Sequence, residues 1–239
     1  LTAGQGQAFA YGGAGNDRIV MNGGYYGGSG TSGRAYGGIG DDVVLFTAPV
    51  SARAQGGDGI DMLSITVSGN FGDLTGGQID FSTGSGSFTG PGDLSLTFNG
   101  FERLFFQGNQ GDDTVIGGAL DDTAYLYTGN NSADMGAGND TVASRYGGQL
   151  TLHGGEGDDV LILMDAVFPV YFIVDGLDGS VDDGQLSVIT GFERYEMLGS
   201  TGNDIIGLGN GEDTGRGLAG ADTLFGAGGN DLLLGNGGA

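Results

Sequence analysis

The sequence predicts an all-β fold in which the chain winds as a parallel β-solenoid. Two observations lead to this prediction. The 239 residues include 56 glycines, far above ordinary usage, and a nine-residue pattern recurs along the chain. Glycine-rich chains are fibrous, disordered or repetitive, but disorder is disfavoured here because 38% of the residues are hydrophobic and recur at regular intervals. A repetitive, packed fold is the remaining interpretation.

The charge balance points to divalent cations. The chain carries 30 acidic and 7 basic residues, all of the latter arginine, for a formal net charge of −23. This charge excludes nucleic acid as an expected partner. Crowded carboxylates repel one another unless cations neutralise them, and calcium suits a ligand set made only of oxygen atoms. Because the chain has no cysteine, neither a disulfide framework nor a thiolate metal site is available.

The repeat reads Gly-Gly-x-Gly-x-Asp-x-U-x, where U is a large apolar residue. Close matches begin at Gly12, Gly37, Gly56 and Gly154. Two longer runs, 108–143 and 199–234, keep the nine-residue register without interruption. Chance glycine richness would not keep such a register, so the repeat is a structural unit.

Each position of the repeat has a physical reason. Glycines allow positive φ and close backbone approach, so a six-residue turn can aim its carbonyl oxygens at one point. The sixth-position carboxylate aims at the same point, and residues seven to nine form a short strand with an inward apolar side chain. Two nonapeptides complete one coil, so a turn stacks on the turn eighteen residues later, about 4.8 Å away. Calcium ions, with about six to eight oxygen ligands each, fit between stacked turns.

The sixth positions are therefore the predicted calcium ligands. They are Asp17, Asp42, Asp61, Asp113, Asp122, Asn131, Asp140, Asp159, Asp204, Asp213, Asp222 and Asp231. The eighteen-residue rule pairs Asp122 with Asp140, Asp204 with Asp222, Asp213 with Asp231, and Asp113 with the neutral Asn131. A nineteen-residue spacing with one bulged residue pairs Asp42 with Asp61 and Asp140 with Asp159. Asp17 is left without a clear partner, because the pattern decays after Met21.

Several ligand positions follow a second acid. These fifth-position acids are Asp41, Asp112, Asp121 and Asp158. They are expected to add negative field and solubility rather than metal ligands.

Two segments depart from the nonapeptide, 65–107 and 163–198, and they end alike in Phe-Glu-Arg, at positions 101–103 and 192–194. We interpret them as wider calcium-free coils with strands at 94–98 and 171–174. Whether Glu102 and Arg103 form a solvated ion pair or a lateral contact site stays open. The chain thus divides into N-terminal β-roll coils (1–64), a first insert (65–107), a central β-roll (108–162), a second insert (163–198) and a C-terminal β-roll (199–239).

Catalytic motifs do not assemble. His153 is the single histidine, and the sequence has no zinc-protease, hydrolase or thiol-enzyme signature. Paired carboxylates could catalyse glycoside hydrolysis, but here the pairs recur at regular spacing along the chain, as expected for repeated metal sites. The sequence therefore predicts that the protein is not an enzyme.

The nonapeptides resemble those of the RTX proteins, a family of toxins, lipases, proteases, surface-layer proteins and adhesins. The resemblance implies a β-roll that folds on binding several calcium ions after type I secretion, with the sixth-position aspartates as ligands. It also implies a secreted, extracellular or cell-surface location. No apolar run approaches the ~18 residues of a membrane span.

These features predict a calcium-binding structural protein of a bacterial filament or surface layer, built by self-association that could be head to tail. A cell-surface polysaccharide is a possible further partner. Two alternatives stay open. One is an adhesin that recognises its ligand through the two inserts, and the other is the RTX secretion module of a larger toxin or enzyme.

Overall fold

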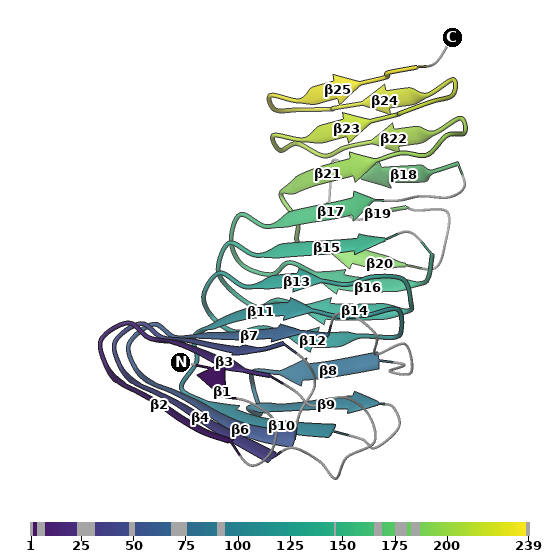
Figure 1. The fold of residues 1–239 in the computed structure, drawn as a ribbon. Helices are drawn as coiled ribbons and strands as arrows, with labels where there is room; N and C mark the ends of the chain where they lie inside the picture. The colour runs from purple at the N-terminus through teal and green to yellow at the C-terminus, as the bar shows by residue number, and fades with distance from the viewer. Residues whose placement is uncertain are drawn as a thin grey trace.

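The structure is a computed structural model that describes residues 2–3, 8–22, 32–47, 51–67, 76–89, 94–145, 147–164, 169–174, 181–182 and 187–237. These residues form 25 strands and no helix, so the predicted all-β fold is confirmed. Figure 1 shows the strands stacked in coil after coil from the N-terminal to the C-terminal end. Among the described residues there is accordingly no helix long and apolar enough to cross a membrane.

The first sheet runs the length of the molecule with eleven strands, and every pair of neighbours in it is parallel. In spatial order these are β1 (Thr2–Ala3), β3 (Arg18–Met21), β5 (Val43–Phe46), β7 (Met62–Thr66), β11 (Arg103–Gln107), β13 (Thr123–Tyr125), β15 (Thr141–Arg145), β17 (Val160–Met164), β21 (Arg194–Leu198), β23 (Thr214–Arg216) and β25 (Leu232–Leu234).

The opposite wall of the solenoid consists of two sheets. The ten-stranded sheet contains β2 (Ala8–Ala14), β4 (Ser32–Ile39), β6 (Ser51–Asp58), β10 (Leu94–Asn99), β9 (Ser85–Thr89), β8 (Gly76–Asp80), β12 (Thr114–Ile116), β14 (Asn131–Asp134), β16 (Leu150–His153) and β20 (Val188–Thr190). The four-stranded sheet contains β19 (Val181–Asp182), β18 (Tyr171–Val174), β22 (Ile205–Gly207) and β24 (Thr223–Phe225).

Strand alternation forms the core between the walls. In β5 and β17 every second side chain is fully buried, as with Val44 and Phe46 in β5 and with Leu161 and Leu163 in β17. The intervening side chains are only partly buried. A short strand with one or two large apolar residues is therefore enough to add each coil to the hydrophobic core.

The first insert differs from the plain wider coil that the sequence predicts. Its strands β8, β9 and β10 pair antiparallel, so the chain reverses twice within the ten-stranded sheet. The first reversal is a turn after Asp80, whose Oδ1 accepts hydrogen bonds from the Ser82 hydroxyl (2.6 Å) and the Thr83 N–H (3.1 Å). Gly84 completes that turn with a φ of +63°, which favours glycine. The predicted strands at 94–98 and 171–174 are confirmed as β10 and β18.

Candidate metal sites in the glycine turns

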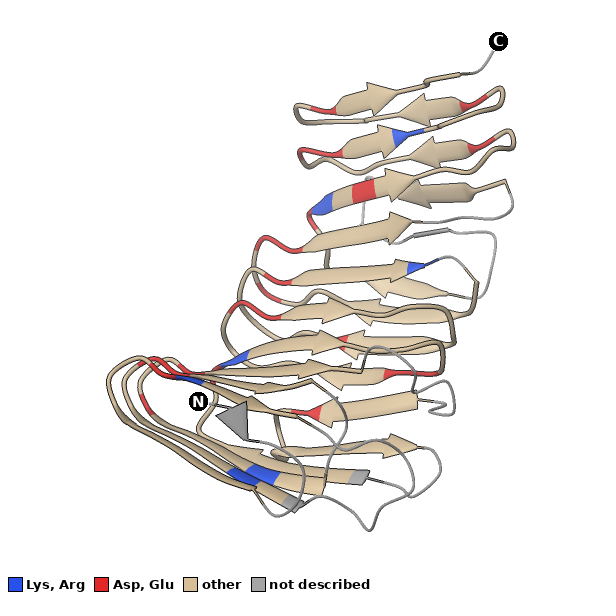
Figure 2. Ribbon diagram, viewed as in Figure 1, with Lys and Arg blue, Asp and Glu red and all other residues tan. Residues whose placement is uncertain are grey.

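The predicted ligands lie in two columns along the edges of the solenoid. In the turns that lead into the first sheet are Asp17, Asp42, Asp61, Asp122, Asp140, Asp159, Asp213 and Asp231. At the starts of strands in the opposite wall are Asp113, Asn131, Asp204 and Asp222. Figure 2 shows acidic residues recurring at the strand ends of successive coils. The nine-residue register thus brings side chains that are distant in sequence into one line.

Within a column, one carboxylate oxygen links each turn to the turn before it. The N–H of Asp122 donates to Oδ1 of Asp140 (2.7 Å), and the N–H of Asp140 donates to Oδ1 of Asp159 (2.7 Å). The same bond joins Asp42 to Asp61 (2.7 Å), Asp113 to Asn131 (3.0 Å), Asp204 to Asp222 (3.0 Å) and Asp213 to Asp231 (3.2 Å). The stacked pairs predicted from the spacing are therefore confirmed as neighbours.

Asp17 corrects one prediction. The sequence leaves it without a partner, yet its N–H donates to Oδ1 of Asp42 at 2.8 Å. The strands that follow these two residues pair in register, with Arg18 opposite Val43, so this coil is 25 residues long. The coil closes because strand pairing sets the register of the turns, whatever the number of residues between them.

The second carboxylate oxygen has a different environment. Oδ2 is buried and has no hydrogen-bond partner in Asp17, Asp42, Asp61, Asp140, Asp159, Asp213 and Asp222. Burial raises the pKa of Asp140 to about 7 and the pKa values of Asp113 and Asp122 to about 6. A buried ionised oxygen without a partner is costly, so the unpartnered Oδ2 atoms require a cation or a proton.

Glycine at the first position of most of these turns keeps space beside that oxygen. A Cβ on Gly12 would lie 2.8 Å from Oδ2 of Asp17 and 2.5 Å from the carbonyl oxygen of Gly37 in the next coil. Gly37 has the same two neighbours, Oδ2 of Asp42 and the carbonyl oxygen of Gly56. Carboxylate and carbonyl oxygens thus converge where only a glycine fits.

This donor set fits calcium. Hard divalent cations take carboxylate and backbone carbonyl oxygens, which are the atoms that the turns bring together. Within the described ranges no three acidic or histidine side chains converge on one point. An ion between two turns would therefore draw on the carboxylates of stacked coils and on backbone carbonyls.

The fifth-position acids form a second, outer ladder. Oδ1 of Asp121 accepts the N–H of Asn139 (2.9 Å), and Oδ1 of Asn139 accepts the N–H of Asp158 (3.0 Å). Here the acceptor belongs to the earlier coil, whereas in the sixth-position ladder it belongs to the later one. Side chains at the two positions therefore link successive coils in opposite directions, with the fifth-position ones exposed to solvent.

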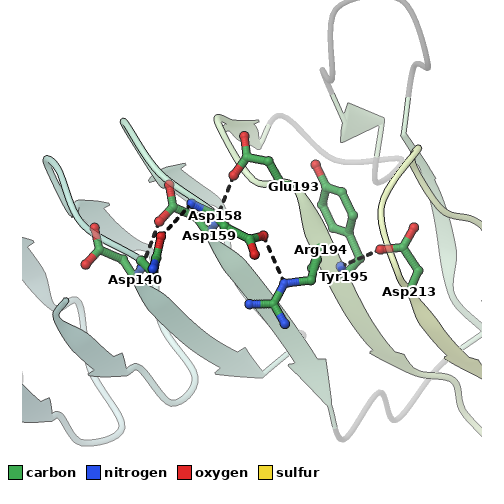
Figure 3. A network of polar contacts seen from close by, with 8 residues as sticks. Asp140, Asp158, Asp159, Glu193, Arg194, Tyr195 and Asp213 are labelled. Atoms are coloured by element: carbon green, nitrogen blue, oxygen red, sulfur yellow. Dashed lines mark hydrogen bonds and ion pairs between the residues drawn. The ribbon is translucent and has the colours of Figure 1, made fainter. Parts of the chain in front are cut away.

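At the two Phe-Glu-Arg turns a glutamate takes the place of the aspartate. The N–H of Asp61 donates to Oε2 of Glu102 (2.9 Å), and the N–H of Asp159 donates to Oε2 of Glu193 (2.8 Å). Figure 3 shows Glu193 continuing the line of Asp140 and Asp159. Sequence reasoning missed this role, because the repeat specifies aspartate. The available signal was the recurrence of Gly-Phe-Glu-Arg directly before a strand.

The arginines of these turns are exposed and pair with acids of neighbouring coils. Arg103 lies 3.5 Å from Asp121, and Arg194 Nε lies 3.0 Å from Asp158 Oδ1. All four side chains are exposed by 40% or more. Each arginine thus forms a solvated ion pair with a fifth-position acid, while the neighbouring glutamate faces the inner column.

His153 closes β16 and makes a contact between strands. Its Nδ1 lies 2.5 Å from the hydroxyl oxygen of Thr190 in β20, the neighbouring strand of the sheet. This contact gives the single histidine a structural partner.

Comparison with known families agrees with this geometry. The RTX calcium-binding nonapeptide repeat matches the chain in four copies, over residues 107–142, 151–164 and 208–239. No curated protein matches the chain. The matched segments contain seven aspartates of the columns: Asp113, Asp122, Asp140, Asp159, Asp213, Asp222 and Asp231. Repeats of this type bind several calcium ions.

Proposed function

We propose, from the premise that the chain carries RTX calcium-binding nonapeptide repeats, that it is a secreted structural protein which calcium orders outside the cell. The observation behind this proposal is the column of buried aspartates, each with one oxygen in the hydrogen-bonded ladder and several with the other oxygen unpartnered. Such a column is unfavourable without cations and favourable with them, so folding becomes dependent on calcium.

The twelve sixth-position residues are the proposed ligands. Nine of them are 2% exposed or less, whereas Asp17, Asp222 and Asp231 are partly buried. Asn131 offers a neutral oxygen, so the site that it shares with Asp113 should be weaker than the sites built from two aspartates. An arrangement tied into a repeating ladder supports a structural role for these carboxylates rather than a catalytic one.

Assembly into a filament or surface layer is the finer part of the proposal. Strand β25 is at the edge of the first sheet and β24 at the edge of the four-stranded sheet. Phe225, Leu232 and Leu233 are exposed there, although Leu233 packs toward Gly215 on the core side. An open edge with uncovered apolar residues accepts another coil, supplied either by a longer polypeptide or by a second copy.

Sedimentation and electron microscopy of the chain in millimolar calcium and in excess chelator test the assembly. We expect long particles in calcium and none in chelator, with fewer particles for Leu233→Asp, because the charge would be buried on stacking. Stable monomers of the unmodified chain at high concentration in calcium would rule out the filament while leaving calcium-dependent folding intact.

A further inference from the structure

One outer surface of the solenoid has a composition unlike the rest of the chain. On the solvent side of β2, β4 and β6, the side chains of Phe9, Arg34 and Arg53 form one row, because Phe9 pairs with Arg34 and Arg34 with Arg53. A second row contains Tyr11 and Tyr36. We call these five residues the arginine–aromatic face. Figure 2 shows the two arginines of β4 and β6 side by side at the N-terminal end of the molecule.

In these strands the large aromatic side chains point to solvent and the small ones point to the core, whereas packing alone would favour the opposite arrangement. The inward residues Ala10, Ala35 and Ala54 are small and buried. The outward residues Phe9 and Tyr11 are large, and they are 54% and 62% exposed. Large aromatic side chains held in the open over adjacent strands indicate a binding surface.

The rings and cations of the face are already ordered. Tyr11 and Tyr36 stack with their ring centroids 4.8 Å apart and their planes 4° from parallel. The guanidinium of Arg34 lies 5.7 Å from the ring centroid of Phe9. The side chains thus present ordered, partly exposed aromatic rings beside two positive charges.

The charges themselves point to an anion. Arg34 and Arg53 are direct neighbours across the strands, and like charges in that relation are destabilising. In a chain with 30 acidic residues, neither forms an ion pair within the part that the structure describes. Two unpaired arginines at one strand spacing suit a carboxylate or sulfate, which guanidinium groups bind through paired hydrogen bonds.

The face also contains room for a ligand. A hollow of about 370 Å³ is bounded by Phe9, Arg34, Arg53 and Thr97, among others. A second hollow, of about 200 Å³, adjoins it and is bounded by Tyr36, Gln55 and Asn99 together with Arg53 and Thr97. Arg53 is thus common to both hollows, and amide and hydroxyl groups surround it.

We propose that the arginine–aromatic face binds a glycan that carries acidic groups, either uronic acids or sulfated sugars. Sugar rings would stack on the exposed aromatic rings, the arginines would bind the acidic group, and Gln55, Thr97 and Asn99 would bond to hydroxyls. The net charge of −23 does not exclude such a ligand, because charges more than about 8 Å away are screened at physiological ionic strength.

Calorimetric titration in millimolar calcium tests the proposal with defined hexasaccharides. The probes are hyaluronan, which carries carboxylates, chondroitin 4-sulfate, which adds sulfates, and neutral chitohexaose. We expect at least one acidic probe to bind and the neutral probe to bind about tenfold more weakly or not at all. The relative affinities of the two acidic probes identify whether carboxylate or sulfate is preferred.

Matched variants assign the binding to this face. The double variant Arg34→Gln with Arg53→Gln should weaken binding of the acidic probe by about tenfold or more, and Tyr11→Ala should weaken it as well. Arg216→Gln removes one positive charge from β23, remote in the sheet order, and should leave binding unchanged. The proposal is overturned if no acidic probe binds, if the double variant binds normally, or if a thymidine oligonucleotide binds equally well through the same arginines.

Discussion

At the scale of single residues, the two oxygens of most sixth-position aspartates have separate roles. In Asp140, Oδ1 accepts the N–H of Asp122, whereas Oδ2 is buried without a partner. Asparagine can preserve the first role through its amide oxygen but not the charge that a cation requires. The natural Asn131, whose Oδ1 accepts the N–H of Asp113, shows that the ladder tolerates this exchange.

Replacing Asp140 with asparagine should therefore separate calcium binding from the ladder. We expect Asp140→Asn to raise the calcium concentration at the folding midpoint by about tenfold, because one ligand charge is lost. The measurement is a calcium titration followed by circular dichroism.

The matched control is Asp121→Asn, a fifth-position change in the same part of the solenoid. Asp121 is exposed and belongs to the outer ladder. The calcium concentration at the folding midpoint of Asp121→Asn should therefore remain close to that of the unmodified protein. Equal midpoints for the two variants would contradict the assignment of the sixth position as the ligand.

At the scale of elements, the Phe-Glu-Arg turns show how the ladder continues across an insert. Each turn begins at a glycine of positive φ, +61° for Gly100 and +70° for Gly191. Glu193 lies opposite Asp159 in the preceding coil, but Tyr195 rather than Glu193 lies opposite Asp213 in the following one. The turn thus shifts the register by two residues, and the longer glutamate side chain still reaches the column.

This geometry predicts different effects for two substitutions at one position. Glu102→Ala leaves the N–H of Asp61 without its acceptor and should destabilise the folded state by about 1–3 kcal/mol. Glu102→Gln keeps an oxygen acceptor and should cost less. Urea unfolding in saturating calcium measures both, and equal stability of the alanine variant and the unmodified protein would show that the turn does not depend on this bond.

Most of the aspartate columns could be predicted from the sequence, because a nine-residue period fixes which turns stack. The Asp17–Asp42 contact could not, since the 25-residue coil contains residues outside the repeat, and strand pairing alone sets its register. The antiparallel β8–β10 segment was also missed. Its alternating residues suit either strand direction, and the reversal depends on the local turn around Asp80.

The arginine–aromatic face has a signal in the sequence. Three segments align before the first nonapeptides, AFAYGG, GRAYGG and ARAQGG, each with small residues alternating with large or charged ones. Alternation predicts that the small residues face inward. The alignment across strands becomes visible only when the register is known.

At the scale of the whole molecule, stability is a balance between coil stacking and carboxylate repulsion. Ionised groups about 5 Å apart repel by about 3 kcal/mol at an effective dielectric near 20. Bound calcium removes this repulsion, and so does protonation. The molecule therefore has two routes to a stable column, and they respond to pH in opposite ways.

Without calcium, the folded state should be most stable in acid. Burial raises the pKa of Asp140 to about 7 and those of Asp113 and Asp122 to about 6, from the usual 3.8. Because the folded state holds these protons more tightly than the unfolded state, stability is greatest below pH 4 and falls as pH rises to about 7. With calcium, which needs ionised ligands, stability should rise over the same range. Melting temperatures measured in chelator and in calcium check this, and a metal-free stability that increases from pH 4 to 7 would be inconsistent with it.

The most direct test of calcium-dependent folding is far-ultraviolet circular dichroism at pH 7, recorded first in excess chelator and then in millimolar calcium. The unscreened carboxylate columns predict a largely disordered chain in chelator and a strong β-sheet signal once calcium is added, reversible on renewed chelation. The same β-sheet signal in both conditions would contradict the account, because the columns would then be stable without the ions.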